Sequence, residues 1–214
     1  MKTVVLSGFR RFGDYLANST AIVARQLDQK VLGGVRVESI VFSAAIPRIN
    51  RGKQLVGFAR RVDASAIISL GMASDKSGLC VEHVAQNRID GKYVPTSMKG
   101  ARIDVAQPYG HELELDLAPW RFEKLAQSCM TAGVPIMRRS RNAGGFCCNH
   151  LMWQLHQAQL GVPAKKRISA IFLHVPCSLA SVADLDAFTQ AGKVTMEPSE
   201  IIKGLALLIK HASI

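Results

Sequence analysis

Short apolar runs alternate with helical segments along most of the chain, and this alternation constrains the fold more than any other feature. The strand-like runs are almost continuously apolar, which is typical of strands that are buried on both faces. Strands that alternate with helices form parallel pairs through right-handed crossovers, with helices covering both faces of the sheet. The pattern predicts strands over residues 3–8, 35–42, 66–71, 134–139 and 169–175, and helices over 21–28, 49–62, 120–132, 146–161 and 199–211.

These elements predict an α/β fold: a single three-layer α/β/α domain over residues 1–214 with a mostly parallel, twisted central sheet. A chain of 214 residues that is 48% hydrophobic is large enough to bury one sizeable core. Over residues 74–119 the pattern is lost, and we expect an irregular excursion, which in a compact domain is usually functional or partly unfolded. Catalytic groups in such folds gather beyond the carboxyl ends of the strands, here at Gly8, Gly71, Asn142 and His174.

The charge balance allows several classes of partner. Lysine and arginine number 27 against 16 acidic residues, a net charge of +11. Such an excess fits a nucleic-acid partner, an anionic surface or a soluble enzyme that is basic. The basic residues are scattered rather than gathered in a tail, and neither a zinc-finger nor a ribonucleoprotein signature occurs. We therefore expect no nucleic-acid partner, and a nucleic-acid-binding protein is the less favoured alternative.

The apolar runs and the cysteines bear on location. No run approaches the roughly 18 apolar residues that cross a bilayer. The opening run Thr3–Leu6 is interrupted by Ser7 and Gly8, unlike a signal peptide. Five cysteines at irregular spacing are typical of free thiols in a reducing compartment. We expect a cytoplasmic protein without membrane association, in which one thiol is reactive.

The segment Asn142–His150 carries the clearest chemical signal, because it follows a predicted strand and opens a predicted helix. Gly144 and Gly145 permit a tight turn, which places Cys147 and Cys148 on the first helical turn. Unpaired N–H groups and the helix dipole favour a thiolate there and can hold an oxyanion. Spacing alone does not select one of the two thiols, and a small core cysteine is the alternative interpretation.

Two other residues fit a cysteine nucleophile. His174 lies at the end of the strand over 169–175, where an α/β active site is expected, although a core histidine bonded to a carbonyl is the alternative. Glu82 is a lone acid among apolar neighbours, so it is either paired or exposed on a turn. A cysteine and a histidine at the ends of separate strands, with an acid to orient the imidazole, indicate nucleophilic catalysis.

A metal site is the competing interpretation of the same segment. It would use Cys147, Cys148, His150 and His156. The two histidines are six positions apart, which places them on different faces of a helix, and no Cys-x-x-Cys pair is present. We expect neither a metal nor a cofactor.

Four segments in the same order resemble one family of cysteine peptidases. Val5–Gly13 resembles the family's Gly-Phe-x-Pro-Phe-Gly, and Glu82–Asn87 resembles its Glu-Arg-x-Ala-x-Asn. Ala143–His150 resembles Ala-Gly-x-x-x-Cys-Asn, and Phe172–Pro176 resembles Phe-x-His-x-Pro. The family is type I pyroglutamyl peptidase, or pyrrolidone-carboxylate peptidase. One such segment is weak evidence, but four in the right order are specific.

The resemblance implies a phosphorylase/hydrolase-like fold and removal of an N-terminal pyroglutamyl (5-oxoproline) residue from peptides, through a thiolate acyl-enzyme and without a metal. It selects Cys148 as the nucleophile, with Glu82 orienting the imidazole of His174, which takes the Cys148 proton or already holds it in a thiolate–imidazolium pair and later protonates the departing amine. A neutral lactam needs apolar walls and a few aimed hydrogen bonds. By resemblance, Phe9 and Phe12 supply such walls and Asn18 shapes the site. Members of the family commonly form homodimers or homotetramers.

Some positions depart from the family pattern. Arg11 replaces a proline, His83 replaces an arginine, and Asp75-Lys76 replaces a Gly-Arg pair. Lys92, ten residues after the glutamate, replaces an arginine that lies near the nucleophile in the family and is therefore a candidate substrate-binding residue. Lysine offers a point charge instead of a planar fork. An alternative function therefore keeps the fold and nucleophile but acts on another amide or lactam.

Overall fold

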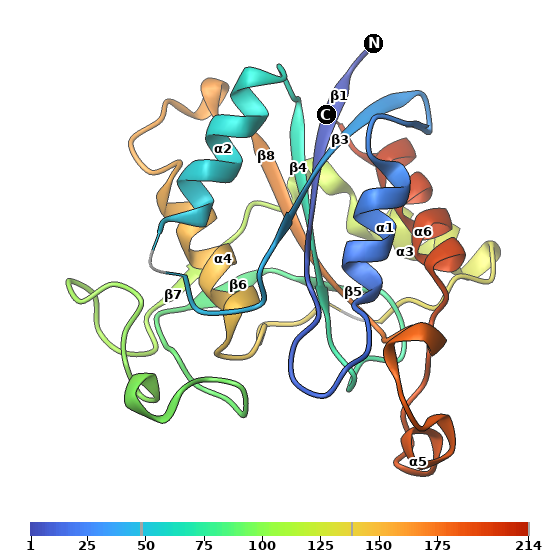
Figure 1. Ribbon diagram of the computed structural model, residues 1–214. Helices are drawn as coiled ribbons and strands as arrows, with labels where there is room; N and C mark the ends of the chain where they lie inside the picture. Colours follow the sequence, from blue (N-terminus) through green and yellow to red (C-terminus); the bar gives the residue numbers. More distant parts are fainter. Residues whose placement is uncertain (48, 138, 214) are drawn as a thin grey trace.

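A twisted six-stranded sheet forms the centre of the molecule in the computed structural model, which describes residues 1–47, 49–137 and 139–213 (Figure 1). The strand order is β2-β3-β1-β4-β8-β5. Four central strands are parallel, whereas β2 and β5 pair antiparallel at the two edges. The strands are β1 (Thr3–Phe9), β2 (Val31–Leu32), β3 (Val35–Phe42), β4 (Ala66–Met72), β5 (Cys80–Glu82) and β8 (Ser169–Val175). The predicted mostly parallel sheet is confirmed.

Helices cover both faces of this sheet. One face carries α1 (Ser19–Leu27), α3 (Phe122–Thr131) and α6 (Pro198–His211), and the other carries α2 (Arg51–Arg61) and α4 (Cys147–Gln157) (Figure 1). The predicted three layers are therefore confirmed.

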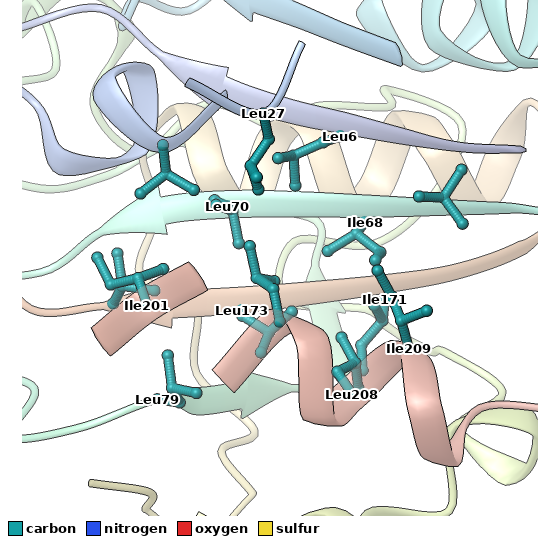
Figure 2. Close-up of a cluster of buried hydrophobic side chains, with 14 of the residues drawn as sticks. Leu6, Leu27, Ile68, Leu70, Leu79, Ile171, Leu173, Ile201, Leu208 and Ile209 are labelled. Atoms are coloured by element: carbon teal, nitrogen blue, oxygen red, sulfur yellow. The ribbon is translucent and has the colours of Figure 1, made fainter. Parts of the chain in front are cut away.

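Successive strand residues feed two separate cores. Leu6 and Leu70 pack toward α1 and α6 (Figure 2), whereas Val5 and Ile67 pack toward α2 and α4. Side chains alternate between the faces of a strand, so a strand between two helical layers is mostly apolar, and its buried polar residues pair with each other, as Ser7 Oγ does in donating to Ser69 Oγ at 2.9 Å. The continuous apolar runs in the sequence follow from this burial.

The end of β1 is held tightly against the start of α1. Asn18 caps the helix, since its side-chain oxygen accepts a hydrogen bond from the Thr20 backbone N–H at 3.0 Å. A Cβ atom at Gly8 would lie 2.5 Å from the Thr20 carbonyl oxygen, so only glycine fits there. The loop between β1 and α1 is thereby fixed at the carboxyl end of the sheet.

The stretch 74–119 is less irregular than its sequence indicates. It contains β5, and also β6 (Val84–Gln86) and β7 (Glu112–Glu114), which pair with each other as a second, two-stranded sheet. Each is three residues long, too short for an alternating pattern to be recognised. Two 3₁₀ turns, Thr96–Met98 and Ala118–Trp120, complete it. The prediction of lost regularity was wrong for these elements and correct for residues 88–95 and 99–111.

One buried amide organises the irregular part. The Asn87 side chain donates to the carbonyl oxygens of Asp104, Gln107 and Pro108 at 2.8–3.0 Å, and its own oxygen accepts from the Asp104 N–H at 2.8 Å. Asn87 is fully buried. These hydrogen bonds hold the two ends of the irregular segment 88–111 together.

The segment predicted as a strand over 134–139 is not a regular strand in its described residues. These residues and Ser140 form isolated parallel bridges, between Ile136 and Leu79 and between Ser140 and Glu82. Pro135 has no N–H to donate, which limits regular pairing at this edge. Residue 138 of the predicted strand lies outside the described residues.

The remaining short elements carried no periodic signal. They are the helix α5 (Leu185–Gln190), which projects from the body of the molecule (Figure 1), and the 3₁₀ turns Ala164–Lys166 and Leu179–Ser181. Among the described residues, no helix is both long enough and apolar enough to span a bilayer.

Candidate active site

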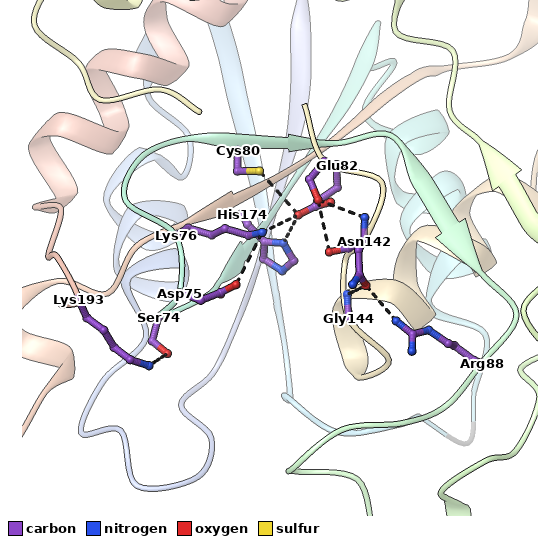
Figure 3. A network of polar contacts seen from close by, with 11 residues as sticks. Ser74, Asp75, Lys76, Cys80, Glu82, Arg88, Asn142, Gly144, His174 and Lys193 are labelled. Carbon is purple, nitrogen blue, oxygen red and sulfur yellow. Dashed lines mark hydrogen bonds and ion pairs between the residues drawn. The ribbon is translucent and has the colours of Figure 1, made fainter. Parts of the chain in front are cut away.

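A buried carboxylate–imidazole pair lies at the carboxyl end of the central strands. The Glu82 Oε1 atom is 2.9 Å from His174 Nδ1 (Figure 3). Antiparallel pairing of β5 with β8 brings the two together, because Cys80 lies opposite His174 and Glu82 opposite Phe172. Glu82 is fully buried and His174 is only 5% exposed. The alternative in which Glu82 is exposed on a turn does not apply.

Positive and hydrogen-bonding groups surround the Glu82 carboxylate. Burial alone would raise its pKa, but hydrogen bonds with His174 and Ser140 and the charges of His174 and Lys76 lower the pKa below its ordinary value. The Lys76 ammonium lies 3.7 Å from Oε1. Glu82 is therefore ionised at neutral pH and can only accept hydrogen bonds, so His174 carries its proton on Nδ1 and leaves Nε2 free to accept one.

The Cys148 thiol lies beside that free imidazole nitrogen. Gly71, on β4, is the register partner of His174 on β8. A Cβ atom at Gly71 would lie 2.8 Å from Cys148 Sγ and 2.9 Å from His174 Nε2. Both atoms thus crowd one point, and the sulfur is no more than about 6 Å from the nitrogen. The missing side chain at Gly71 makes room for the two groups.

The two neighbouring thiols occupy different environments. Cys147 is 3% exposed and packs in the core between the sheet and α4, whereas Cys148 is half-buried. A hydrogen bond with Cys147, burial and the charges of Cys147 and Glu82 raise the Cys148 pKa well above its ordinary value. The start of the helix opposes this shift, since its N–H groups and dipole favour the thiolate.

Two glycines in the loop before α4 allow the backbone of the segment around Asp90 to pack closely against it. Gly144 has a φ of +78°, a left-handed conformation that glycine adopts readily. At Gly145 a Cβ atom would lie 2.7 Å from the Asp90 nitrogen, so the excursion packs directly on this loop. No side chain of the described residues caps the start of α4, which leaves N–H groups of its first turn available.

A single side chain joins the thiol-bearing helix to the acid-bearing segment. Asn149, next to Cys148, accepts a hydrogen bond from the Gln86 N–H at 2.8 Å and donates to the Gln86 and Arg88 carbonyl oxygens at 2.7 and 3.1 Å. Asn149 is fully buried. It thereby holds the segment that follows Glu82 against α4.

A cavity of about 520 Å³ opens in front of these groups, within the range of ordinary ligand pockets. Cys148 and His174 line it. Its walls include aromatic rings in mutual contact: the Phe12 ring is 5.0 Å from the Tyr93 ring and 6.3 Å from the Phe146 ring, centroid to centroid. The cavity therefore offers apolar walls beside a thiol and an imidazole.

Comparison with known proteins assigns the family. A family model described as pyroglutamyl peptidase matches residues 2–213. The chain belongs to the pyroglutamyl peptidase family. It is 33% identical over 192 residues to a pyrrolidone-carboxylate peptidase of Mycobacterium tuberculosis, covering 87% of this chain and 82% of the relative. It is 30% identical over 195 residues to the enzyme of that name from Oceanobacillus iheyensis, covering 89% and 92%.

Solved structures agree with this family assignment. The pyrrolidone carboxyl peptidase of Thermococcus litoralis superimposes with a TM-score of 0.77 at 25% identity, covering 99% of this chain and 93% of that one. The pyroglutamyl peptidase I of Bacillus amyloliquefaciens gives a TM-score of 0.78 at 20% identity, covering 100% and 95%, and shows the shared fold.

The four residues that the family resemblance placed around the substrate all line the cavity. Phe12 belongs to the aromatic wall, while Phe9 is 1% exposed and packs mainly into the core. Asn18 is buried, and its hydrogen bonds go to Thr20 and to the Arg10 carbonyl oxygen, so it shapes the loop. Lys92 is exposed, with its ammonium 5.4 Å from the centre of the Tyr93 ring.

Several residues that line this cavity were not predicted from the sequence. Tyr93 and Phe146 complete the aromatic wall, and Ser74 and Lys193 form another part of the lining. Phe146 directly precedes Cys147 in the segment already singled out, so that position was a usable signal. Lys193 carried none, because it reaches the cavity from an irregular segment after α5.

The candidate metal ligands do not form a cluster. In the described part of the chain, no three His, Cys, Asp or Glu side chains are grouped so as to hold a metal ion. His150 packs near Arg51 and Gln154, whereas His156 lines a separate cavity. The pyroglutamyl peptidase fold thus separates residues that are close in the sequence.

Proposed function

We propose that this protein hydrolyses the amide bond that follows an N-terminal pyroglutamyl residue in peptides, with Cys148 as nucleophile. The family assignment supports this substrate and reaction. The observation that carries the mechanism is the buried Glu82–His174 hydrogen bond beside the Cys148 thiol. A metal or cofactor takes no part in the steps that we propose.

In the first half-reaction, the proton of the Cys148 thiol passes to His174 Nε2 and sulfur attacks the carbonyl carbon of the pyroglutamyl group. The proton passes either as sulfur attacks or beforehand, in a thiolate–imidazolium pair. Glu82 holds the imidazole by its Nδ1–H and stabilises the cation that forms. N–H groups at the start of α4 receive the developing oxyanion.

The amine then departs to complete the acyl-enzyme, and water hydrolyses it. The imidazolium of His174 gives its proton to the departing amine as the carbon–nitrogen bond breaks, which leaves a thioester on Cys148. Water then attacks the thioester while His174 takes a proton from that water; the carbon–sulfur bond breaks, His174 returns the proton to sulfur, and free pyroglutamate leaves. The aromatic wall contributed by Phe12, Tyr93 and Phe146 suits a small neutral lactam.

The test compares two adjacent cysteines with a fluorogenic pyroglutamyl amide, pyroglutamyl-aminomethylcoumarin. Cys148→Ser abolishes release of the fluorophore, while the neighbouring Cys147→Ser, a matched control on the same turn, keeps most of it. Iodoacetamide inactivates the wild type and a chelator does not. The reverse ranking of the two variants, or chelator inhibition that zinc reverses, contradicts the mechanism.

A second substrate separates this function from its alternatives. The same assay with prolyl-aminomethylcoumarin presents a ring of similar size without the lactam carbonyl. We expect turnover of the pyroglutamyl compound alone. Turnover of the prolyl compound, or of neither, indicates another amide substrate or a protein without peptidase activity.

We also propose that residues 1–214 act as one catalytic unit in the cytoplasm and associate into a homodimer or homotetramer. Among the described residues no disulfide joins any two of the five cysteines, which fits a reducing compartment. Exposed apolar side chains at Leu16, Leu179, Leu185 and Val194 suit contact with another subunit. Light scattering after size-exclusion chromatography measures the mass: a monomer at micromolar concentration contradicts association.

A further inference from the structure

Lys193 enters the catalytic cavity from a segment that lies far from the other site residues in the sequence. It follows α5, the short helix that projects from the body of the molecule (Figure 1), and returns toward the carboxyl end of the sheet. Its Nζ atom lies 3.1 Å from Ser74 Oγ (Figure 3), and both residues line the same cavity as Cys148. The ammonium is therefore part of the cavity wall.

The neighbouring charges leave this ammonium uncompensated. The other cationic wall residue on its side, Lys76, pairs with Asp75 at 3.8 Å and with Glu82 at 3.7 Å. Asp90, also on the wall, lies 4.0 Å from an Arg88 nitrogen. Within the described parts of the chain no ion pair includes Lys193. An anion that enters the cavity thus finds a positive charge that has no acidic partner.

The position of Ser74 indicates which part of a substrate meets this charge. Ser74 lies three residues beyond Gly71, the position that the Cys148 sulfur crowds. Three residues span at most about 10 Å. An extended peptide advances about 3.3–3.6 Å per residue, so the first two residues after the cleaved bond span about 7 Å and a glutamate side chain extends the remaining few ångströms. The pyroglutamyl group itself is neutral and forms no ion pair with a cation there.

We propose that Lys193 binds a carboxylate in the departing portion of the substrate, so that peptides with an acidic side chain at the first or second position after pyroglutamate are preferred. The proposal rests on the proposed function and adds a substrate class to it. Lys193 does not touch the reacting atoms, so its role is specificity. The Ser74 hydroxyl positions the ammonium by accepting its hydrogen bond.

The experiment uses substrate pairs that differ only in charge. Release of pyroglutamate is measured from pyroglutamyl-Glu-Gly-amide and pyroglutamyl-Gly-Glu-amide, each against the counterpart with Gln in place of Glu. An exposed ion pair is worth up to about 1 kcal/mol, so the wild type prefers at least one Glu peptide about fivefold in kcat/KM. Because screening weakens such a pair, 0.5 M NaCl reduces the preference.

Variants assign the preference to this residue. Lys193→Met, which keeps the length and removes the charge, brings the ratio to about one, and Lys193→Arg retains it. Lys165→Met removes an equal charge near the opposite end of β8 and leaves the ratio unchanged. Thermal melts verify that each variant is folded.

Several results overturn the proposal: equal rates for Glu and Gln peptides at both positions in the wild type, a ratio that survives Lys193→Met, or an equal loss in Lys165→Met. If Lys193→Met does not fold, a salt-insensitive ratio in the wild type overturns it instead. Failure of the proposed function is distinct, because then neither these peptides nor pyroglutamyl-aminomethylcoumarin are cleaved.

Discussion

Gly71→Ala places one methyl group at the meeting point of the reactive groups. Its Cβ atom would lie 2.8 Å from Cys148 Sγ and from His174 Cδ2, and 2.9 Å from His174 Nε2. Ordinary contacts between carbon atoms lie at about 3.5–4.0 Å, so the thiol and the imidazole must each retreat by about 0.7 Å or more. A misplacement near 1 Å costs about 10²-fold in rate. We expect kcat/KM to fall by about that factor.

The fold should survive the same change. Gly71 has no positive φ, so alanine meets no backbone strain in β4. Overpacking a core costs about 1–3 kcal/mol, and each kcal/mol lowers the Tm of a domain of this size by about 2–4 °C. Activity is therefore lost to a far greater extent than stability.

The assay combines initial rates on pyroglutamyl-aminomethylcoumarin with a thermal melt. Gly57→Ala is the matched control: it lies on α2, where the added Cβ atom meets only Arg61 Nη1 at an ordinary 3.8 Å. Alanine in a helix is favoured over glycine by up to about 1 kcal/mol, so this variant keeps its activity and melts no earlier. A Gly71→Ala protein with more than half of the wild-type kcat/KM refutes the proposed crowding.

Three further perturbations test other parts of the structure. Glu82→Gln removes the charge that fixes the His174 tautomer, so kcat/KM should fall by about 10³–10⁴ with the melt little changed; an active variant would show that Glu82 is dispensable. Burial and a nearby positive charge lower the pKa of His150 from 6.5 to about 4, so the unfolded state binds the extra proton. Stability is then lost as pH falls from 6.5 toward 4, by about 2 kcal/mol at pH 5; His150→Gln should flatten the Tm profile between pH 7 and 5, and an unchanged profile contradicts this. Asn87→Ala removes the bonds that close residues 88–111, so limited trypsin digestion should cut there faster than in the wild type; equal protection would mean that other contacts suffice.

The regular elements of the sheet and its covering helices could be predicted because they are locally encoded. Their burial can be recognised from a local pattern without knowing which distant residues cover them. Examples are the continuous apolar runs at 66–71 and 169–175 and the helix that begins at Cys147. Cys148 and His174 could be singled out because the ends of parallel strands are where α/β sites form.

The rest depends on contacts between distant residues. Glu82 meets His174 only because the three-residue strand β5 pairs antiparallel with β8, and no periodicity in three residues signals such a pairing. The pKa of Cys148 is also set by neighbours in space, since the hydrogen bond with Cys147 and burial raise it. Lys193 approaches Ser74 across 119 positions of sequence.

The side chain of Asn149 has a consequence for the order of folding. Its bonds to Gln86 join positions that are 63 residues apart. Closing so long a loop is entropically costly until both ends are packed, so such contacts form late. The sulfur and the carboxylate consequently reach their final alignment near the end of assembly, and a half-folded chain still holds its nucleophile apart from the acid that orients its base.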